Sequence, residues 1–359
     1  MADPLLACAS LDLAKNDPSY RSLAMKYYGQ GVKVLRENIA LGKVEGTEDW
    51  VLLNVLHLNL FEAWNATSQT PSLLHIQGAA QMLMLRGTTH SRSESNELAH
   101  PDDKVSARIA VESVVYHTVN WSIFNGNPIP MPLNELWDFL EPAFATPPFP
   151  AASEAENSPV LGVPWQLYRF LSEATQLARL LPLDALGLES ALALTDRLNA
   201  WESTAMLGDE NTAELDPATA VFRYKQRARL SVIALKILMF KLVHPDAAVA
   251  SQTIQDLLSQ ALQIIQLQVG ERFHFWPLLM IGSAVLRGDQ VRIIRSRLGE
   301  MSTTMRSGSF LKVKGTLEVI WDTVVPENTG RSCGNLTPTS PDGLDLLLGR
   351  DGRPGLMTH

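Results

Sequence analysis

The sequence predicts an all-α protein, with a single large multi-helix body followed by a disordered C-terminal tail. Three observations lead to this prediction. Apolar residues recur three and four positions apart along most of the chain, which is the spacing of helices with a buried face. No stretch alternates apolar and polar residues over the length of a useful strand. Hydrophobic residues make up 46% of the 359 residues and charged residues 19%, so the chain can fill a large core.

Five helices are predicted in the first part of the chain, separated by prolines and polar segments. The first carries Leu5, Leu6, Ala9 and Leu13 and ends at Asn16-Asp17-Pro18. Asp49 is a suitable N-cap for the third helix. Prolines between positions 128 and 132 end the fifth. The expected ranges are 4–14, 20–39, 49 onward, 73–87 and 105–124.

The composition changes after the fifth helix. Residues 141–162 hold five prolines and few large apolar side chains, which indicates an exposed Pro-rich insert. Helices are expected again at 164–181 and 187–201. The longest helix is expected to begin at Asp216-Pro217 and to end at His244-Pro245. Its apolar residues surround much of its circumference, so it is predicted to be central in the body.

The stretch from Leu257 to Trp321 organises the predicted body. It contains a helix with an apolar stripe, a second helix whose first turn includes Pro277, and a basic-faced surface helix over 289–298. Trp276 and Leu279 are expected in the core beside the longest helix. Residues 326–359 are rich in Gly and Pro and are expected to be a disordered tail. The predicted domain therefore spans 1–325, with 141–162 as its insert.

Charge and cysteine content limit the function. The formal net charge is −8, and an acidic chain without a concentrated basic patch is poorly suited to neutralising phosphates, so direct nucleic-acid binding is not expected. Cys8 and Cys333 have no CxxC neighbour, and no metal site is predicted from them. The apolar run at 275–284 is too short to span a bilayer, so no membrane interaction is expected. Nucleotide and nucleophile motifs are missing, so no cofactor is predicted.

Several short strings in a fixed order carry a resemblance to a known family. The strongest is Phe275-Trp276-Pro277-Leu278-Leu279-Met280-Ile281-Gly282-Ser283-Ala284, with Arg292 downstream and Trp321 closing the set. Upstream come a Tyr-Tyr helix ending in Leu35-Arg36, then Phe61-Glu62, His75-Ile76-x-Gly78-Ala79, and Arg108 with Tyr116-His117. Together they resemble the fungal-specific transcription factor domain, the helical regulatory half of zinc-cluster transcription factors. The resemblance covers roughly Asp3 to Thr323 and implies an all-helical body that senses small molecules between its helices.

The resemblance also implies a DNA-binding part that this sequence does not contain. In the family, six cysteines holding two zinc ions precede the helical domain, whereas here Met1 stands almost inside the first family helix. If Met1 is the natural start, we expect a protein that keeps the regulatory body without the reader of DNA.

Four residues are the candidates for a ligand or substrate site. His75 begins a helix whose next residues are apolar, so its ring is expected to face the body. His117 and Trp121 stand four apart on one helix and can jointly present a hydrogen bond and a flat surface. Trp276 is a further candidate for a ligand-binding ring, and His75 and His117 are candidates for catalysis. For each of them the competing interpretation is ordinary core packing.

Two functions fit these observations. The first is a nuclear, transcription-factor-like regulator of fungal secondary metabolism, acting through a hydrophobic small molecule, a zinc-cluster transcription factor or a homodimer. The second is a cytoplasmic, cofactor-independent enzyme of a biosynthetic cluster. It would use the apolar helical pocket for a hetero-Diels–Alder reaction or a dehydration. The sequence favours the regulator and leaves open whether the chain is an enzyme.

Overall fold

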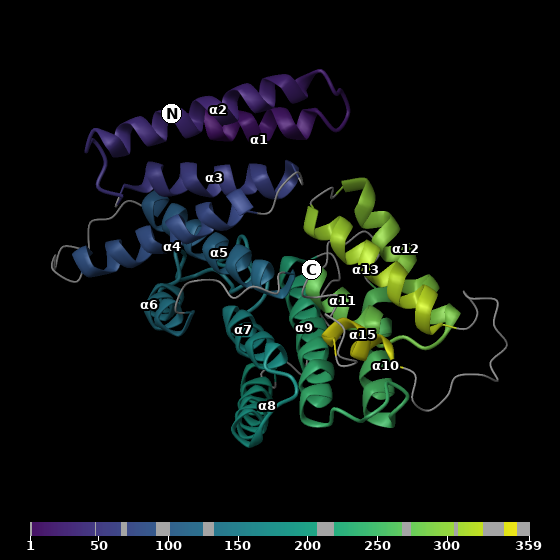
Figure 1. Ribbon diagram of the computed structural model, residues 1–359. Coiled ribbons are helices and arrows are strands. Elements are labelled where there is room, and N and C mark those ends of the chain that lie inside the picture. Colours follow the sequence, from purple (N-terminus) through teal and green to yellow (C-terminus); the bar gives the residue numbers. More distant parts are fainter. Residues whose placement is uncertain are drawn as a thin grey trace. The chain divides into compact units, whose positions relative to one another are not determined.

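The computed structural model describes residues 2–46, 48–65, 70–90, 101–124, 133–206, 219–267, 274–304, 308–325 and 341–349. All regular structure in these segments is helical, which confirms the predicted all-α class (Figure 1). No helix among the described residues is long and apolar enough to cross a membrane. The chain divides into two compact units. Unit 1 comprises Met1–Thr118 and Ile129–Leu161, and unit 2 comprises Val119–Pro128 and Gly162–His359.

Unit 1 is built on an N-terminal helical hairpin. Helix α1 (Asp3–Leu13) packs against α2 (Tyr20–Ala40) and α3 (Asp49–Asn65), and α3 packs against α4 (Thr70–His90). The unit also contains most of α5 (Pro101–Phe124) and α6 (Leu133–Ala145). The close approach of α1 and α2 depends on Gly31, because a Cβ there would lie 2.8 Å from the Cγ of Pro4.

The buried face of α1 consists of small residues. Ala7, Cys8 and Leu11 join Ala24 and Phe61 in one apolar cluster. The longer side chains of α1 lie on the other side, with Leu5 54% and Leu13 49% exposed. The helix therefore packs closely through Ala7 and Cys8, with Leu11 beside them, and presents its other three leucines outward.

Unit 2 is organised around α9 (Ala220–Val243). This helix packs against α7 (Trp165–Arg179), α8 (Ala185–Met206), α10 (Gln252–Leu267) and α11 (Phe275–Ser283), which confirms its predicted central place. The expected start at Asp216-Pro217 lies outside the described residues. The observed N-cap is Thr219, whose side chain accepts a hydrogen bond from the Phe222 amide at 3.2 Å.

The predicted organising stretch from Leu257 to Trp321 contributes to the core of the second half of unit 2, as expected. Every residue of α11 is buried, Trp276 is 2% exposed and Leu279 is 1% exposed, and α11 packs on α9. Helices α12 (Gly288–Thr304) and α13 (Gly308–Val324) complete this part. The indole nitrogen of Trp321 donates a 2.8 Å hydrogen bond to the carbonyl oxygen of Gly282. At Gly282 a Cβ would lie 2.7 Å from Leu317, so only glycine allows α11 and α13 to come this close.

The interpretation of α12 as a basic-faced surface helix is only partly right. Arg292 is exposed, but Arg297 is 4% exposed, and its Nη2 donates a 2.7 Å hydrogen bond to the carbonyl oxygen of Ile265 near the end of α10. Arg295 forms a bidentate pair with Glu318 at 3.0 and 2.6 Å. These arginines hold neighbouring helices together, because carbonyl and carboxylate oxygens at those positions match the guanidinium fork.

Much of the predicted insert at 141–162 is exposed, but the stretch is ordered and partly helical. Helix α6 continues to Ala145 with Pro142 inside it, and the loop that follows is held by the buried side chain of Asn157. This amide accepts from the Phe149 nitrogen and donates to the Phe149 oxygen, both at 3.0 Å. Leu161 is fully buried at the end of the loop. Proline content indicated a lack of regular structure, but side-chain hydrogen bonds such as those of Asn157 order the loop.

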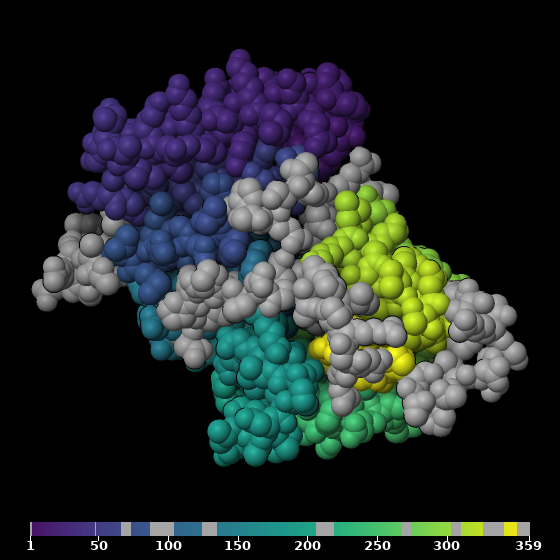
Figure 2. Space-filling view, viewed as in Figure 1, coloured from purple at the N-terminus to yellow at the C-terminus, as the bar shows by residue number. Residues whose placement is uncertain are grey.

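The predicted tail contains a described helix. Residues 341–349 form α15 (Gly343–Leu348) with its caps, and α15 packs on α11 and α13. The rest of the predicted tail, residues 326–340 and 350–359, lies outside the described residues. In Figure 2 the yellow segment lies against the green helices of unit 2.

Candidate functional site

The four candidate site residues fall in different units. His75 on α4 and His117 on α5 belong to unit 1, whereas Trp121 on α5 and Trp276 on α11 belong to unit 2. Neither unit therefore contains all four residues, so they do not form one site within a unit. Their roles in ligand binding or catalysis stay predictions.

His117 is the candidate with the most informative environment. Its side chain is half-buried, and burial lowers its pKa to about 4. The imidazole is thus neutral near pH 7, with one nitrogen that donates and one that accepts a hydrogen bond. Its ring meets that of Tyr116 edge-on, with centroids 5.2 Å apart and an interplanar angle of 87°. Such a group is suited to holding a ligand by a hydrogen bond.

The remaining candidates have simpler surroundings. His75 is half-buried, and burial lowers its pKa as well. Trp121 is half-buried one turn after His117, on the same helix. Trp276 is almost fully buried in the core of unit 2, where packing alone accounts for its position. His57, which is not one of the four candidates, has its Nδ1 2.6 Å from the carbonyl oxygen of Leu53 in its own helix.

A polar cluster in unit 2 was missed at the sequence level. The hydroxyl of Tyr168 and the Nδ1 of His274 are 2.9 Å apart and share a hydrogen bond. Burial, and then the positive charge of Arg227, lower the pKa of His274 to about 3, so the ring is neutral. Gly162 has φ +59, and a Cβ on it would lie 2.8 Å from Arg227 Nη1 and 3.7 Å from His274 Nε2. A cation and a neutral imidazole thus lie beside the backbone of Gly162, and the imidazole is hydrogen bonded to the phenol of Tyr168.

The groups of this cluster bond to one another and to the backbone. Beside the Tyr168–His274 hydrogen bond, Arg227 Nε donates to the carbonyl oxygen of Arg223 at 3.3 Å. Its members are far apart in the chain, since Tyr168 and His274 are separated by 106 positions. The one local signal was Gly162, a glycine that ends a proline-rich stretch.

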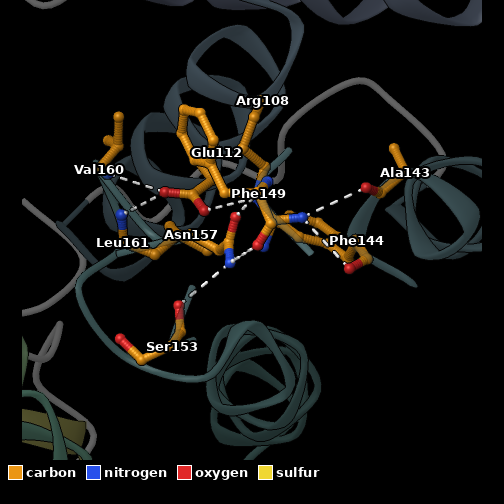
Figure 3. Close-up of polar contacts among 9 residues, drawn as sticks. All are labelled: Arg108, Glu112, Ala143, Phe144, Phe149, Ser153, Asn157, Val160 and Leu161. Atoms are coloured by element: carbon orange, nitrogen blue, oxygen red, sulfur yellow. Dashed lines mark hydrogen bonds and ion pairs between the residues drawn. The ribbon is translucent and has the colours of Figure 1, made fainter. Parts of the chain in front are cut away.

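A second polar network closes the loop of unit 1 on α5 (Figure 3). Glu112 has a fully buried side chain, and its Oε1 accepts from the Nε of Arg108 at 2.8 Å. Its Oε2 accepts from the backbone amides of Val160 and Leu161 at 2.8 and 2.9 Å. Arg108 Nη1 in turn donates to the carbonyl oxygen of Phe144 at 3.2 Å, near the end of α6. These bonds tie the loop and the end of α6 to α5.

Metal-ligating side chains are dispersed in the part of the chain that the structure describes. No group of three or more His, Cys, Asp or Glu residues is placed there to hold an ion.

The family comparison covers nearly all of the described helices. The chain matches the family described as fungal specific transcription factor domain over residues 2–324. No curated protein and no solved structure matches the chain. The match covers far more than half of the sequence and includes both helical units up to the end of α13. The chain therefore belongs to the fungal-specific transcription factor domain family.

Proposed function

We propose that this protein is a regulatory body in the control of transcription, acting in the nucleus through a partner protein and an apolar small molecule. The family match over residues 2–324 carries the proposal, because it covers both units. The role in fungal secondary metabolism that the sequence suggests stays a prediction. No observation on the described residues singles out the cycloaddition alternative.

Surface charge supports action through a partner instead of direct DNA contact. The formal net charge is −8, whereas proteins that bind duplex DNA neutralise several phosphates with lysine and arginine. Basic residues in α12 and just before its start are also engaged with acids. Arg287 pairs with Asp289 at 3.0 Å and Arg295 pairs with Glu318 at 2.6 Å. Such pairs reduce the positive charge that α12 offers to phosphate.

The first test separates a regulator from a DNA reader. The purified chain is expected to give no sequence-specific shift of duplex DNA at physiological salt in the presence of competitor DNA. The same chain fused to an unrelated DNA-binding domain is expected to change the output of a reporter gene several-fold. The matched control is the DNA-binding domain alone at equal abundance. A specific shift by the chain alone, or a folded fusion that leaves the reporter unchanged, would contradict the proposal.

The second test concerns His117 as the ligand-holding group. His117→Phe roughly keeps the volume and removes both nitrogens. Reporter output per folded fusion molecule is expected to fall by about tenfold, which is the scale of one lost buried hydrogen bond. The melting temperature at pH 7.5 is expected to change little, because the wild-type ring is already neutral there.

The pH dependence of stability gives an independent check on the same variant. The folded pKa of about 4 lies below the ordinary histidine value, so the unfolded chain takes up the proton first as the pH falls. His117 should therefore lower stability as the pH falls from about 6.5 to about 4. His117→Phe should lack this contribution in denaturant titrations. A variant with normal reporter output but much lower stability at pH 7.5 would show that His117 is structural.

A further inference from the structure

The segment 341–349 occupies a fitted groove on unit 2. Leu344 and Leu347 are both 0% exposed, and α15 packs on α11 and α13. The backbone itself lies close to the groove wall. A Cβ on Gly343 would collide with the carbonyl oxygen of Ser283 and would lie 2.8 Å from Ile320 Cγ2. The segment is therefore held by shape as well as by its two leucines.

A buried lysine in the groove engages the segment by charge. Lys241 of α9 is 1% exposed, and its Nζ lies 3.0 Å from Asp342 Oδ2 and 2.9 Å from Asp345 Oδ1. The third ammonium proton can go to the carbonyl oxygen of Ala247 at 2.8 Å. The backbone nitrogen of Val249 donates to Asp342 Oδ2 at 2.9 Å. The groove thus has one cation and one amide directed at carboxylates of the segment.

The same two carboxylates also form the helix. Asp342 Oδ1 accepts from the Asp345 amide at 2.9 Å, and Asp345 Oδ2 accepts from the Asp342 amide at 3.3 Å, which is a capping box. Gly349 ends the helix with φ 74. Six residues are far too few for a helix that is stable by itself in water. The helical form of this segment therefore depends on the groove.

Lys241 makes an unoccupied groove unfavourable in free energy. If the segment left and nothing replaced it, the ammonium group of Lys241 would lose both of its carboxylate partners, which is unfavourable. The groove is consequently selective for an occupant with two acidic side chains three positions apart. Apolar contacts two positions after each acidic residue complete the pattern, as Leu344 and Leu347 do here.

We propose that unit 2 carries a docking groove for acidic, leucine-bearing helices, that 341–349 is its resident occupant, and that such a helix from a partner protein replaces it. The charge complementarity between Lys241 and two carboxylates identifies the partner's chemistry. The proposal goes beyond the regulatory role and does not depend on it. The resident segment is part of the same chain, so a partner must compete with a tethered ligand of high effective concentration.

The experiment uses a fluorescent peptide covering residues 340–350 and follows its anisotropy with three full-length proteins. In the D342N/D345N protein the resident segment is weakened and the groove is intact. This protein is expected to bind the peptide at least about tenfold more tightly than the wild type, since the resident loses its charge-assisted hydrogen bonds. Adding Lys241→Met to that protein is expected to weaken peptide binding at least about tenfold. A peptide with asparagine at both acidic positions is the matched control.

A second measurement covers the case in which a variant does not fold. Hydrogen exchange on the wild type is expected to show faster exchange at the amides of 346–349 than in α9, because the segment opens without global unfolding. Three results would overturn the proposal. They are equal binding of the acidic and asparagine peptides by a folded D342N/D345N protein, exchange of 346–349 only together with α9, and a wild-type dimer that excess peptide dissociates. The last result would make a second copy of this chain the occupant.

Discussion

Replacing Trp276 with alanine is expected to lower the free energy of unfolding by about 3–5 kcal/mol, the range for loss of a large buried aromatic side chain. Trp276 is 2% exposed and belongs to a helix whose nine residues are all buried. Its neighbours are held by α9 and by the close contact of Gly282 with Leu317, so they have little freedom to fill the cavity.

Denaturant titration followed by circular dichroism measures this effect. The matched control is Leu311→Ala, which removes an apolar side chain of the same unit that is 54% exposed. The control is expected to stay within about 0.5 kcal/mol of the wild type. If the Trp276 variant unfolds at nearly the same denaturant concentration as the control, α11 does not have the organising role described here.

Removing the carboxylate of Glu112 is expected to have an effect of similar size. Glu112→Ala leaves Arg108 without its ion pair and leaves the amides of Val160 and Leu161 without their acceptor. Loss of one partner from a buried ion pair costs about 3–5 kcal/mol, because the other charge stays desolvated. Glu112→Gln keeps one acceptor oxygen and should fall between the wild type and the alanine variant.

An exposed carboxylate provides the comparison for this prediction. Glu37 pairs with Lys33 on the surface of α2 at 3.9 Å, and both side chains are more than half exposed. Glu37→Ala is expected to change stability by no more than about 1 kcal/mol. Thermal unfolding of the two alanine variants side by side is the measurement. Equal melting temperatures would show that the Glu112 network contributes no more than a surface pair.

The sequence supported the prediction of α11 and α9 because their signals are local. A helix that is apolar on all sides has to be buried, and the run from Phe275 to Ser283 has no polar face to expose. The longest helix was predicted to be central for the same reason. The family strings added the order of the elements, which the match over residues 2–324 agrees with.

The sequence could not indicate where charged groups are buried. The alternation of arginines with apolar residues over 289–298 predicts a basic surface face that includes Arg297, but one partner of Arg297 is a carbonyl oxygen 32 positions away. Lys241 is also buried, and its two carboxylate partners lie about a hundred residues downstream. No local pattern indicates such partners. Helical periodicity reports which face of a helix is apolar, not which distant group approaches it.

Short ordered segments were missed for a different reason. Helix α15 has six residues, fewer than two turns, so no period can be read from it. The roles of the candidate site residues stay predictions. His117 is a neutral, half-buried histidine as a ligand-holding group requires, whereas the Tyr168–His274–Arg227 cluster could be found only from the folded chain.

On the small-residue face of α1, the reactivity of one thiol depends on whether the helix is packed in place. Cys8 lies in that face with its Sγ 3.2 Å from the carbonyl oxygen of His57, and burial raises the pKa of its thiol to about 12. Only a thiolate reacts at a useful rate with alkylating reagents or oxidants, so the docked thiol is inert at neutral pH. When α1 separates from α3, the thiol meets water and its ordinary acidity returns. The rate at which Cys8 becomes reactive therefore reports how often the N-terminal hairpin opens while the rest of the molecule stays folded.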